Sequence, residues 1–204
     1  TQMQVSGIEA LLAAVATQPL PFRAYLLATA KHETADTMRP ITEYGGRKYF
    51  DKYDTGRLAK ALGNTPEADG DGYLYRGRGY VQITGRANYA KASRALGLDL
   101  LGSPDLALQP TVAAQILVRG CREGWFTRKK LGDYLPGNYR EARRVVNKMD
   151  DADLIAGYAR KFEAALNSAA LTPKPVAASP APQTDAKGLW AALVTALLGF
   201  LKGR

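Results

Sequence analysis

The chain of 204 residues is 46% hydrophobic and 23% charged, so it is long enough for one folded domain with appendages and is not disordered as a whole. Its net charge of +9 favours polyanionic partners, but no zinc-finger spacing, aromatic RNA-binding signature or helix-turn-helix pattern is present, and we expect no specific binding of nucleic acid. The single cysteine, Cys121, excludes an internal disulfide framework, and we interpret it as a small buried hydrophobic residue.

Two helices are predicted in the first part of the chain. Residues 6–9 (SGIE) have the pattern of a capping box ahead of the apolar run 11–15. Pro19 and Pro21 should end that helix and start the next, because proline is tolerated in the first turn of a helix but not in its interior. The second helix is predicted from about Pro21 to Glu33, which lies at the inner edge of an apolar stripe.

The middle of the chain predicts a small sheet and further helices. Residues 41–56 are polar and aromatic without helical periodicity, so we expect an irregular lobe there. Residues 73–75 and 80–83 are predicted as short strands around a glycine turn. Thr84 is predicted to cap a helix that ends at Gly97. The remaining helices are predicted over residues 110–123, 139–148 and 151–167, which makes the chain mainly α-helical.

The composition changes near residue 170. We predict a catalytic domain over residues 1–170, a Pro/Ala-rich linker over 171–187 and an apolar, basic-ended helix over 188–204. The apolar run 189–201 would be about 20 Å long as a helix, which is short for a bilayer core of about 30 Å. We expect this helix to contact an anionic membrane surface. The alternatives are that it packs on the domain or self-associates.

A metal site is not predicted. His32 and Glu33 begin an HExxH-like pattern, but position 36 is Asp and His32 is the only histidine, so a zinc protease is excluded. Asp69 and Asp71 resemble the start of a calcium loop whose remaining ligands are missing. We expect no cofactor.

Two carboxylates have the unlike settings that acid/base catalysis requires. Glycoside hydrolysis needs a protonated acid at the leaving oxygen and a second, ionised group that activates water. Glu33 lies on the apolar edge of a helix and suits the acid, whereas Glu43 lies in a polar loop and suits the base. The alternative is a helix-terminal Glu and a solvated Glu without a catalytic role.

Four segments resemble a known family. Residues 32–34 (HET), 75–89 (YRGRGYVQITGRANY), 97–108 (GLDLLGSPDLAL) and 145–150 (VVNKMD) are similar to motifs of glycoside hydrolase family 19, the plant-type chitinases, and especially of its phage and bacterial endolysins. The resemblance covers about residues 20 to 168. It implies a lysozyme-like helical fold with a cleft between two lobes.

The resemblance also implies roles for individual residues. Glu33 would be the general acid, and Thr84 would help to hold the nucleophilic water. Lys148 stands where the family usually has Gly, which departs from the motif around Asn147. The residues that would bind sugar are, by motif position, Tyr75, Gln82, Asn88 and Asn147.

The second carboxylate is the larger departure from the family, because the loop that carries it is shorter than in plant chitinases. Glu43 is our preferred residue, with Asp51 and Asp54 as competitors. The family inverts configuration, so the two carboxyl groups should lie about 6.5–9.5 Å apart. Arg76 and Arg78 are predicted to pair with Glu33 or Glu43.

The charge of the chain favours one polymer over another. Chitin is neutral, whereas peptidoglycan carries peptide carboxylates that attract a basic protein. We therefore expect a monomeric endolysin-type lysozyme that binds peptidoglycan glycan strands, with a chitinase or a non-catalytic wall-binding or membrane-active module as alternatives. No signal peptide is visible at the start, and we expect synthesis in the host bacterial cytoplasm and action at the cell wall or in the periplasm.

Overall fold

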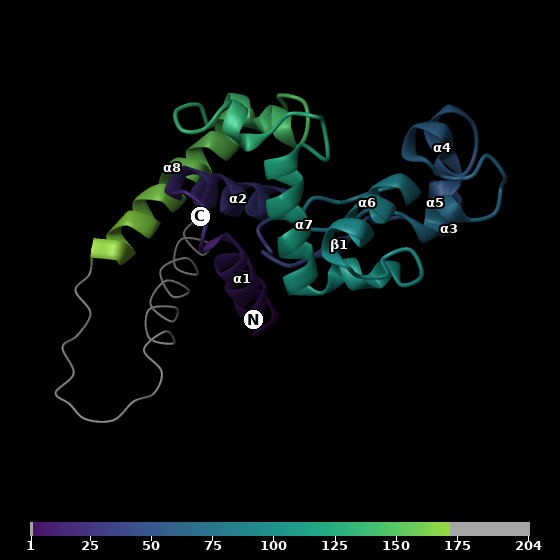
Figure 1. The fold of residues 1–204 in the computed structure, drawn as a ribbon, viewed down its shortest axis with the longest axis horizontal. Coiled ribbons are helices and arrows are strands. Elements are labelled where there is room, and N and C mark those ends of the chain that lie inside the picture. The colour runs from purple at the N-terminus through teal and green to yellow at the C-terminus, as the bar shows by residue number, and fades with distance from the viewer. Residues whose placement is uncertain (1, 172–204) are drawn as a thin grey trace.

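A computed structural model describes residues 2–171 and shows a mainly helical fold with a small two-stranded sheet (Figure 1). The elements are α1 (Gln2–Val15), α2 (Leu20–Glu33), β1 (Ile41–Thr42), α3 (Arg47–Phe50), α4 (Gly56–Leu62), α5 (Asp71–Leu74), β2 (Arg78–Gly79), α6 (Arg86–Leu96), α7 (Pro110–Glu123) and α8 (Ala152–Leu171). Short 3-10 helices cover Asp51–Tyr53, Pro104–Leu108, Leu131–Asp133 and Glu141–Val145. Beyond Leu171, the predicted linker and the helix predicted over 188–204 lie outside the described residues.

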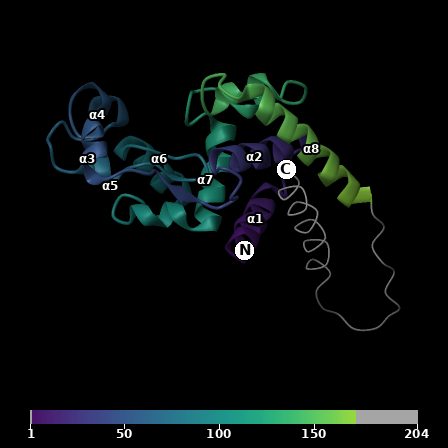
Figure 2. The same cartoon turned by 180° about the vertical axis from the view of Figure 1, so that it is seen from behind.

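The helices form two lobes, as the sequence predicts. A larger lobe contains α1, α2, α7 and α8, and a smaller lobe at the opposite end contains α3, α4 and α5 (Figures 1 and 2). In the larger lobe α2 packs against α8 and α1 packs against α7. Every residue of α2 from Ala24 to Lys31 is buried, and α8 faces it with an apolar stripe of Ile155, Ala159, Phe162 and Leu166. No helix within residues 2–171 is long and apolar enough to cross a bilayer.

The sheet connects two distant parts of the chain. β1 and β2 are antiparallel, with Ile41 opposite Gly79 and Thr42 opposite Arg78. The pairing continues one residue further, where the Glu43 N–H donates to the Gly77 carbonyl at 2.7 Å. The ladder therefore fixes Glu43 beside the glycine-rich segment that contains the family-like motif.

Several helix predictions are confirmed. Pro19 is the residue before α2 and Pro21 lies in its first turn, and the helix ends at Glu33. α7 has the predicted bounds, and α6 ends at Gly97 in the left-handed conformation that glycine adopts without strain.

Two predicted helix starts are wrong. α1 begins at Gln2 rather than at Ser6, whose hydroxyl instead donates to the Gln2 carbonyl one turn back at 2.9 Å. Gly85, not Thr84, precedes α6, because the backbone there has a φ of 88° that favours glycine. The Thr84 hydroxyl donates to the Gln82 carbonyl at 2.9 Å and caps no helix.

The predicted strands are also largely wrong. Residues 73 and 74 belong to the short helix α5, and Tyr75 follows its last residue. Residues 80–83 form a turn that makes a single bridge back to β2. They do not extend the sheet, because β1 is only two residues long. Tyr80 in that turn is buried and donates to a backbone carbonyl of α1 at 3.0 Å. The helix predicted over residues 139–148 is reduced to the 3-10 helix Glu141–Val145.

Candidate active site

The carboxylate of Glu33 is held by a buried arginine. Glu33 is the last residue of α2, and its Oε1 accepts from Arg143 Nη1 at 2.5 Å. The Arg143 side chain is 3% exposed and that of Glu33 is 18% exposed, so the pair is largely shielded from water. Arg143 Nε also donates to the Asp150 carbonyl at 3.0 Å, which fixes the guanidinium. This arrangement can orient an acid and stabilise the anion that forms when the acid gives up its proton.

The two other reactive side chains near Glu33 have structural roles. Cys121 is fully buried on α7, as predicted, and burial together with the nearby charge of Glu33 raises the pKa of its thiol, which therefore stays protonated. His32 Nε2 lies 3.5 Å from Asp151 Oδ2, just ahead of α8, and so links α2 to the start of that helix.

Glu43 accepts hydrogen bonds on both of its carboxylate oxygens. The Tyr53 hydroxyl donates to Oε1 at 3.1 Å, and the Gly77 N–H donates to Oε2 at 3.0 Å. Burial and the charge of Glu43 raise the pKa of Tyr53, so its hydroxyl keeps the proton that it donates. A Cβ atom at Gly77 would lie 2.9 Å from Gln82 Oε1 and 3.0 Å from Glu43 Oε2, which explains the glycine here. These two contacts fix the position of the Glu43 carboxylate.

The two competing aspartates lie in different settings. Asp54 is buried, and its oxygens accept from the backbone N–H groups of Gly72 at 2.6 Å and Gly70 at 3.1 Å. Both oxygens are therefore used to hold the start of α5. Asp51 is exposed and lines a hollow together with Asp54, and neither Glu33 nor Glu43 lines that hollow. Glu43 stays our predicted second carboxylate.

Substitutions should separate Glu43 from Asp54. We expect Glu43→Gln to lower the hydrolytic rate about a hundredfold, the usual scale for an acid or base. Asp54→Asn should instead lower the free energy of unfolding by about 2 kcal/mol, because a buried carboxylate that accepts two N–H bonds is lost, and should leave the rate per folded molecule close to that of the wild type. Urea titration and initial rates measure the two effects. A larger loss of rate in Asp54→Asn than in Glu43→Gln would show that the second carboxylate is misassigned.

Three residues of the family-like motif are linked by hydrogen bonds beside Glu43. The Gln82 side-chain amide donates to the carbonyls of Ile41 at 2.9 Å and Gly79 at 3.1 Å, so it ties the turn to β1. The Thr84 hydroxyl donates to Gln82, and the Asn88 amide donates to the Thr84 carbonyl at 2.7 Å. Because the Thr84 hydroxyl donates its hydrogen bond to the backbone, its oxygen remains able to accept a hydrogen bond from a water molecule.

The other two residues predicted to bind sugar lie elsewhere. Tyr75 is only 3% exposed, its hydroxyl donates to the Leu101 carbonyl at 3.4 Å, and its ring lies 5.4 Å from that of Tyr89, so it packs mainly within the core. Asn147 is exposed, and its N–H donates to the Arg143 carbonyl, which places it one turn after the residue that holds Glu33.

The predicted pairing of Arg76 and Arg78 with the catalytic carboxylates is wrong. Arg78 is buried and pairs with Asp105 at 2.7 Å, and Arg76 donates to the Tyr73 carbonyl at 2.7 Å. Side chains at successive positions of an extended segment point to opposite faces, so both arginines point away from the face on which Gly77 meets Glu43. The partner of Glu33 is Arg143, which sequence reasoning missed. The one available signal was its position two residues before the family-like segment 145–150.

Comparison with known proteins identifies the fold and the family motif. A family model described as class I chitinase, glycoside hydrolase family 19, matches residues 17–129. An endochitinase of Arabidopsis thaliana is 34% identical over 128 residues, which cover 62% of this chain and 43% of that protein. A glycosyl hydrolase family 19 domain-containing protein of Haemophilus influenzae is 46% identical over 59 residues, which cover 26% of this chain and 30% of that protein.

A solved structure agrees with the architecture. Chitinase C from Streptomyces griseus HUT6037 superposes with a TM-score of 0.54 at 21% identity, over 77% of this chain and 67% of that one. The chain spans less than half the length of the two relatives described above. The matched residues include Glu33, Glu43 and the motif over residues 75–89, and they make up more than half of the sequence. The fold agrees with this match. Because the family model matches more than half of the sequence, the chain belongs to glycoside hydrolase family 19.

Proposed function

We propose that this chain is an endolysin-type lysozyme, which hydrolyses the β-1,4 bonds between N-acetylmuramic acid and N-acetylglucosamine in peptidoglycan and so causes cell lysis. Membership of a glycoside hydrolase family supports a glycosidase. The differing environments of Glu33 and Glu43 support a division into acid and base. The positive charge supports an anionic polymer and is the observation that carries the choice of substrate.

The proposed mechanism uses one group from each of three segments. Glu33 donates a proton to the leaving glycosidic oxygen, and Arg143 stabilises the carboxylate that remains. Glu43 removes a proton from a water molecule held by the Thr84 hydroxyl, and this water attacks the anomeric carbon from the opposite face of the sugar. The product therefore has inverted configuration. Gln82 and Asn88 keep the Thr84 segment in place through their amide hydrogen bonds.

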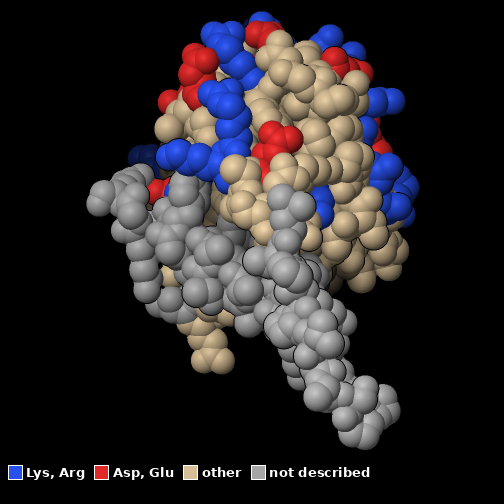
Figure 3. Space-filling view, turned by 90° about the vertical axis from the view of Figure 1, so that its left-hand side faces the viewer, with Lys and Arg blue, Asp and Glu red and all other residues tan. Residues whose placement is uncertain are grey.

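The basic charge is not confined to the C-terminal segment. Residues 172–204 contribute +3 of the net +9, so residues 1–171 keep +6. Figure 3 shows Lys and Arg side chains in a continuous column along one flank of the larger lobe, with a second group at the opposite edge of the same view. Such a surface attracts the carboxylates of peptidoglycan, and it gains nothing electrostatic from chitin.

Chitinase activity is the second candidate, favoured by the names of the Arabidopsis and Streptomyces proteins described above. A side-by-side assay distinguishes the two. We expect the purified full chain to reduce the turbidity of permeabilised Gram-negative cells and to release few sugar ends from colloidal chitin. Faster cleavage of chitin than of peptidoglycan at equal enzyme concentration would instead assign the chitinase.

We further propose that residues 188–204 contact an anionic membrane surface. Lys202 and Arg204 follow the apolar run, and each cation near such a surface adds about 1 kcal/mol of attraction. Truncation after Leu171 should leave hydrolysis of purified peptidoglycan unchanged but reduce binding to anionic vesicles and lysis of intact cells. Vesicles of neutral lipid serve as the control. Unfolding of the truncated protein, or unchanged vesicle binding, would assign this segment a structural role.

A further inference from the structure

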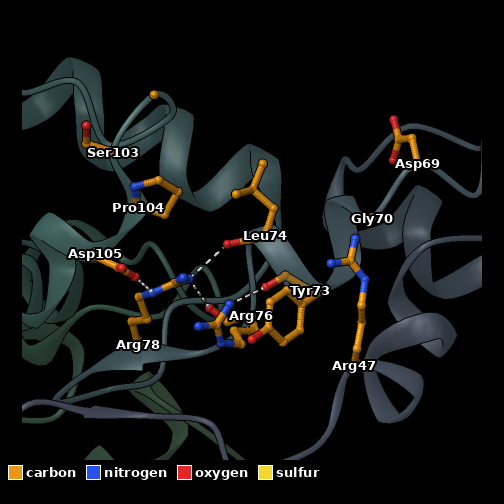
Figure 4. Close-up of a pocket in the computed structure, with 11 residues that line it drawn as sticks. Arg47, Asp69, Gly70, Tyr73, Leu74, Arg76, Arg78, Ser103, Pro104 and Asp105 are labelled. Atoms are coloured by element: carbon orange, nitrogen blue, oxygen red, sulfur yellow. Dashed lines mark hydrogen bonds and ion pairs between the residues drawn. The ribbon is translucent and has the colours of Figure 1, made fainter.

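A pocket of about 640 Å³ lies between the smaller lobe, which contributes Arg47 and Tyr73, and the start of the 3-10 helix Pro104–Leu108 (Figure 4). Arg76 and Arg78 line this pocket, whereas a side chain at Gly77 would point the other way, toward Glu43. A second hollow of about 380 Å³ shares Arg47, Asp69 and Gly70 with it, so the two are adjacent. The volume is in the range of small-molecule and peptide sites. We call the two hollows together the rear groove.

One end of the rear groove is positively charged. The Tyr73 ring lies between two guanidinium groups, with Arg76 at 4.1 Å and Arg47 at 5.3 Å from the ring centroid (Figure 4). Arg78, at the wall of the pocket, is neutralised by Asp105. Within residues 2–171 neither Arg47 nor Arg76 forms an ion pair with a carboxylate. Two guanidinium groups held against one ring form a ready site for carboxylates.

The end of the rear groove beside Asp51 carries acidic side chains, and Arg47 lines it as well. Asp51 and Asp69 are both exposed and line it, whereas Asp54, which also lines it, is buried. Hydrogen bonds from Thr65 and from the backbone hold the pKa of Asp69 below its usual range, so Asp69 stays ionised. Within the described part of the chain no group of three acidic, His or Cys residues could hold a metal ion, so an organic cation is the better ligand for this end.

We propose that the rear groove binds the stem peptide of peptidoglycan. This peptide carries several carboxylates and, where its third residue is a diamino acid, one free ammonium group. The carboxylates would contact Arg47 and Arg76, and the ammonium group would contact Asp69 and Asp51. Chitin carries neither kind of charge, so the groove would add selectivity for the cell wall. The inference rests on the proposed function, because only peptidoglycan supplies this ligand.

The test is a titration of the full chain, followed by calorimetry, with the synthetic tripeptide N-acetyl-L-Ala–γ-D-Glu–diaminopimelate, in which the acetyl group replaces the amide link to the glycan. We expect saturable binding that weakens at least about tenfold in Arg47→Gln and in Arg76→Gln, the scale of a lost hydrogen bond to a charged group. Arg47→Gln is the cleaner variant, because Arg76 also donates to the Tyr73 carbonyl. Arg57→Gln is the matched control, since Arg57 is exposed on α4 and lies outside both hollows, and it should change affinity less than twofold.

The chemistry of the ligand gives a second comparison. A tripeptide whose carboxylates are amidated should not bind, since the groove would lose the contacts to Arg47 and Arg76. The inference would be overturned if the unmodified tripeptide did not bind, or if Arg57→Gln weakened its binding as much as Arg47→Gln does. Either result would count even if the enzyme degrades peptidoglycan. If the enzyme cleaves chitin but not peptidoglycan, the proposed function fails, and the titration still reports separately on the groove.

Discussion

Glu33→Gln should lower the rate of peptidoglycan hydrolysis at least about a hundredfold, because a carboxamide cannot donate the proton that the leaving oxygen needs. The fold should be unchanged, since the glutamine oxygen can still accept the hydrogen bond from Arg143. The measurement is the initial rate of turbidity loss on permeabilised cells, with circular dichroism to confirm folding.

Glu9→Gln provides the control for Glu33→Gln. Glu9 is exposed on α1, so the same chemical change there should leave the rate within about twofold of the wild type. Near-normal hydrolysis of purified peptidoglycan by Glu33→Gln would remove this residue from the mechanism. Retained lysis of cells without hydrolysis would instead indicate the membrane-active alternative.

Arg143→Met should lower both the rate and the stability. The substitution leaves a largely buried carboxylate without its partner, and removing one member of a buried pair costs about 3 kcal/mol of unfolding free energy. The rate should fall about a hundredfold, because small displacements of a reacting group have effects of that size. Arg143→Lys should recover part of the stability but little of the rate, since an ammonium group cannot contact both Glu33 and the Asp150 carbonyl as the guanidinium does.

A double-mutant cycle tests whether the effect of Arg143 acts through Glu33. In the Glu33→Gln background, Arg143→Met should cost at least about 1 kcal/mol less than in the wild type, because no charge is left unpaired. Urea unfolding of the wild type, the two single variants and the double variant gives this coupling free energy. Equal costs in the two backgrounds would mean that Arg143 stabilises the fold through its other contacts and that the ion pair contributes little.

The larger features of the fold were predictable because they depend on local patterns. The proline positions set the start of α2, the apolar residues between them and Glu33 set its buried face, and Gly97 ends α6. The short strands were not predictable, because the backbone in residues 70–85 is set by left-handed glycines and by pairing with β1 rather than by strand propensity.

The candidate site was predictable only where its residues lie within a motif. The setting of Glu33 at the end of an apolar helix, and the order of Gln82, Thr84 and Asn88, could be read from neighbouring residues. The partner of Glu33 could not be predicted from neighbouring residues, because Arg143 lies 110 positions away and the two meet only through tertiary packing. The structural role of Asp54 has the same origin, since its contacts are with backbone N–H groups on a later loop.

Mass spectrometry of the fragments released from purified Gram-negative peptidoglycan identifies the bond that the chain cleaves. After digestion by the full chain and borohydride reduction, we expect disaccharide muropeptides that end in reduced N-acetylmuramic acid, and none of them after treatment with the Glu33→Gln variant. Fragments that end in reduced N-acetylglucosamine, or no fragments from peptidoglycan alongside ready cleavage of chitin oligosaccharides, would contradict it.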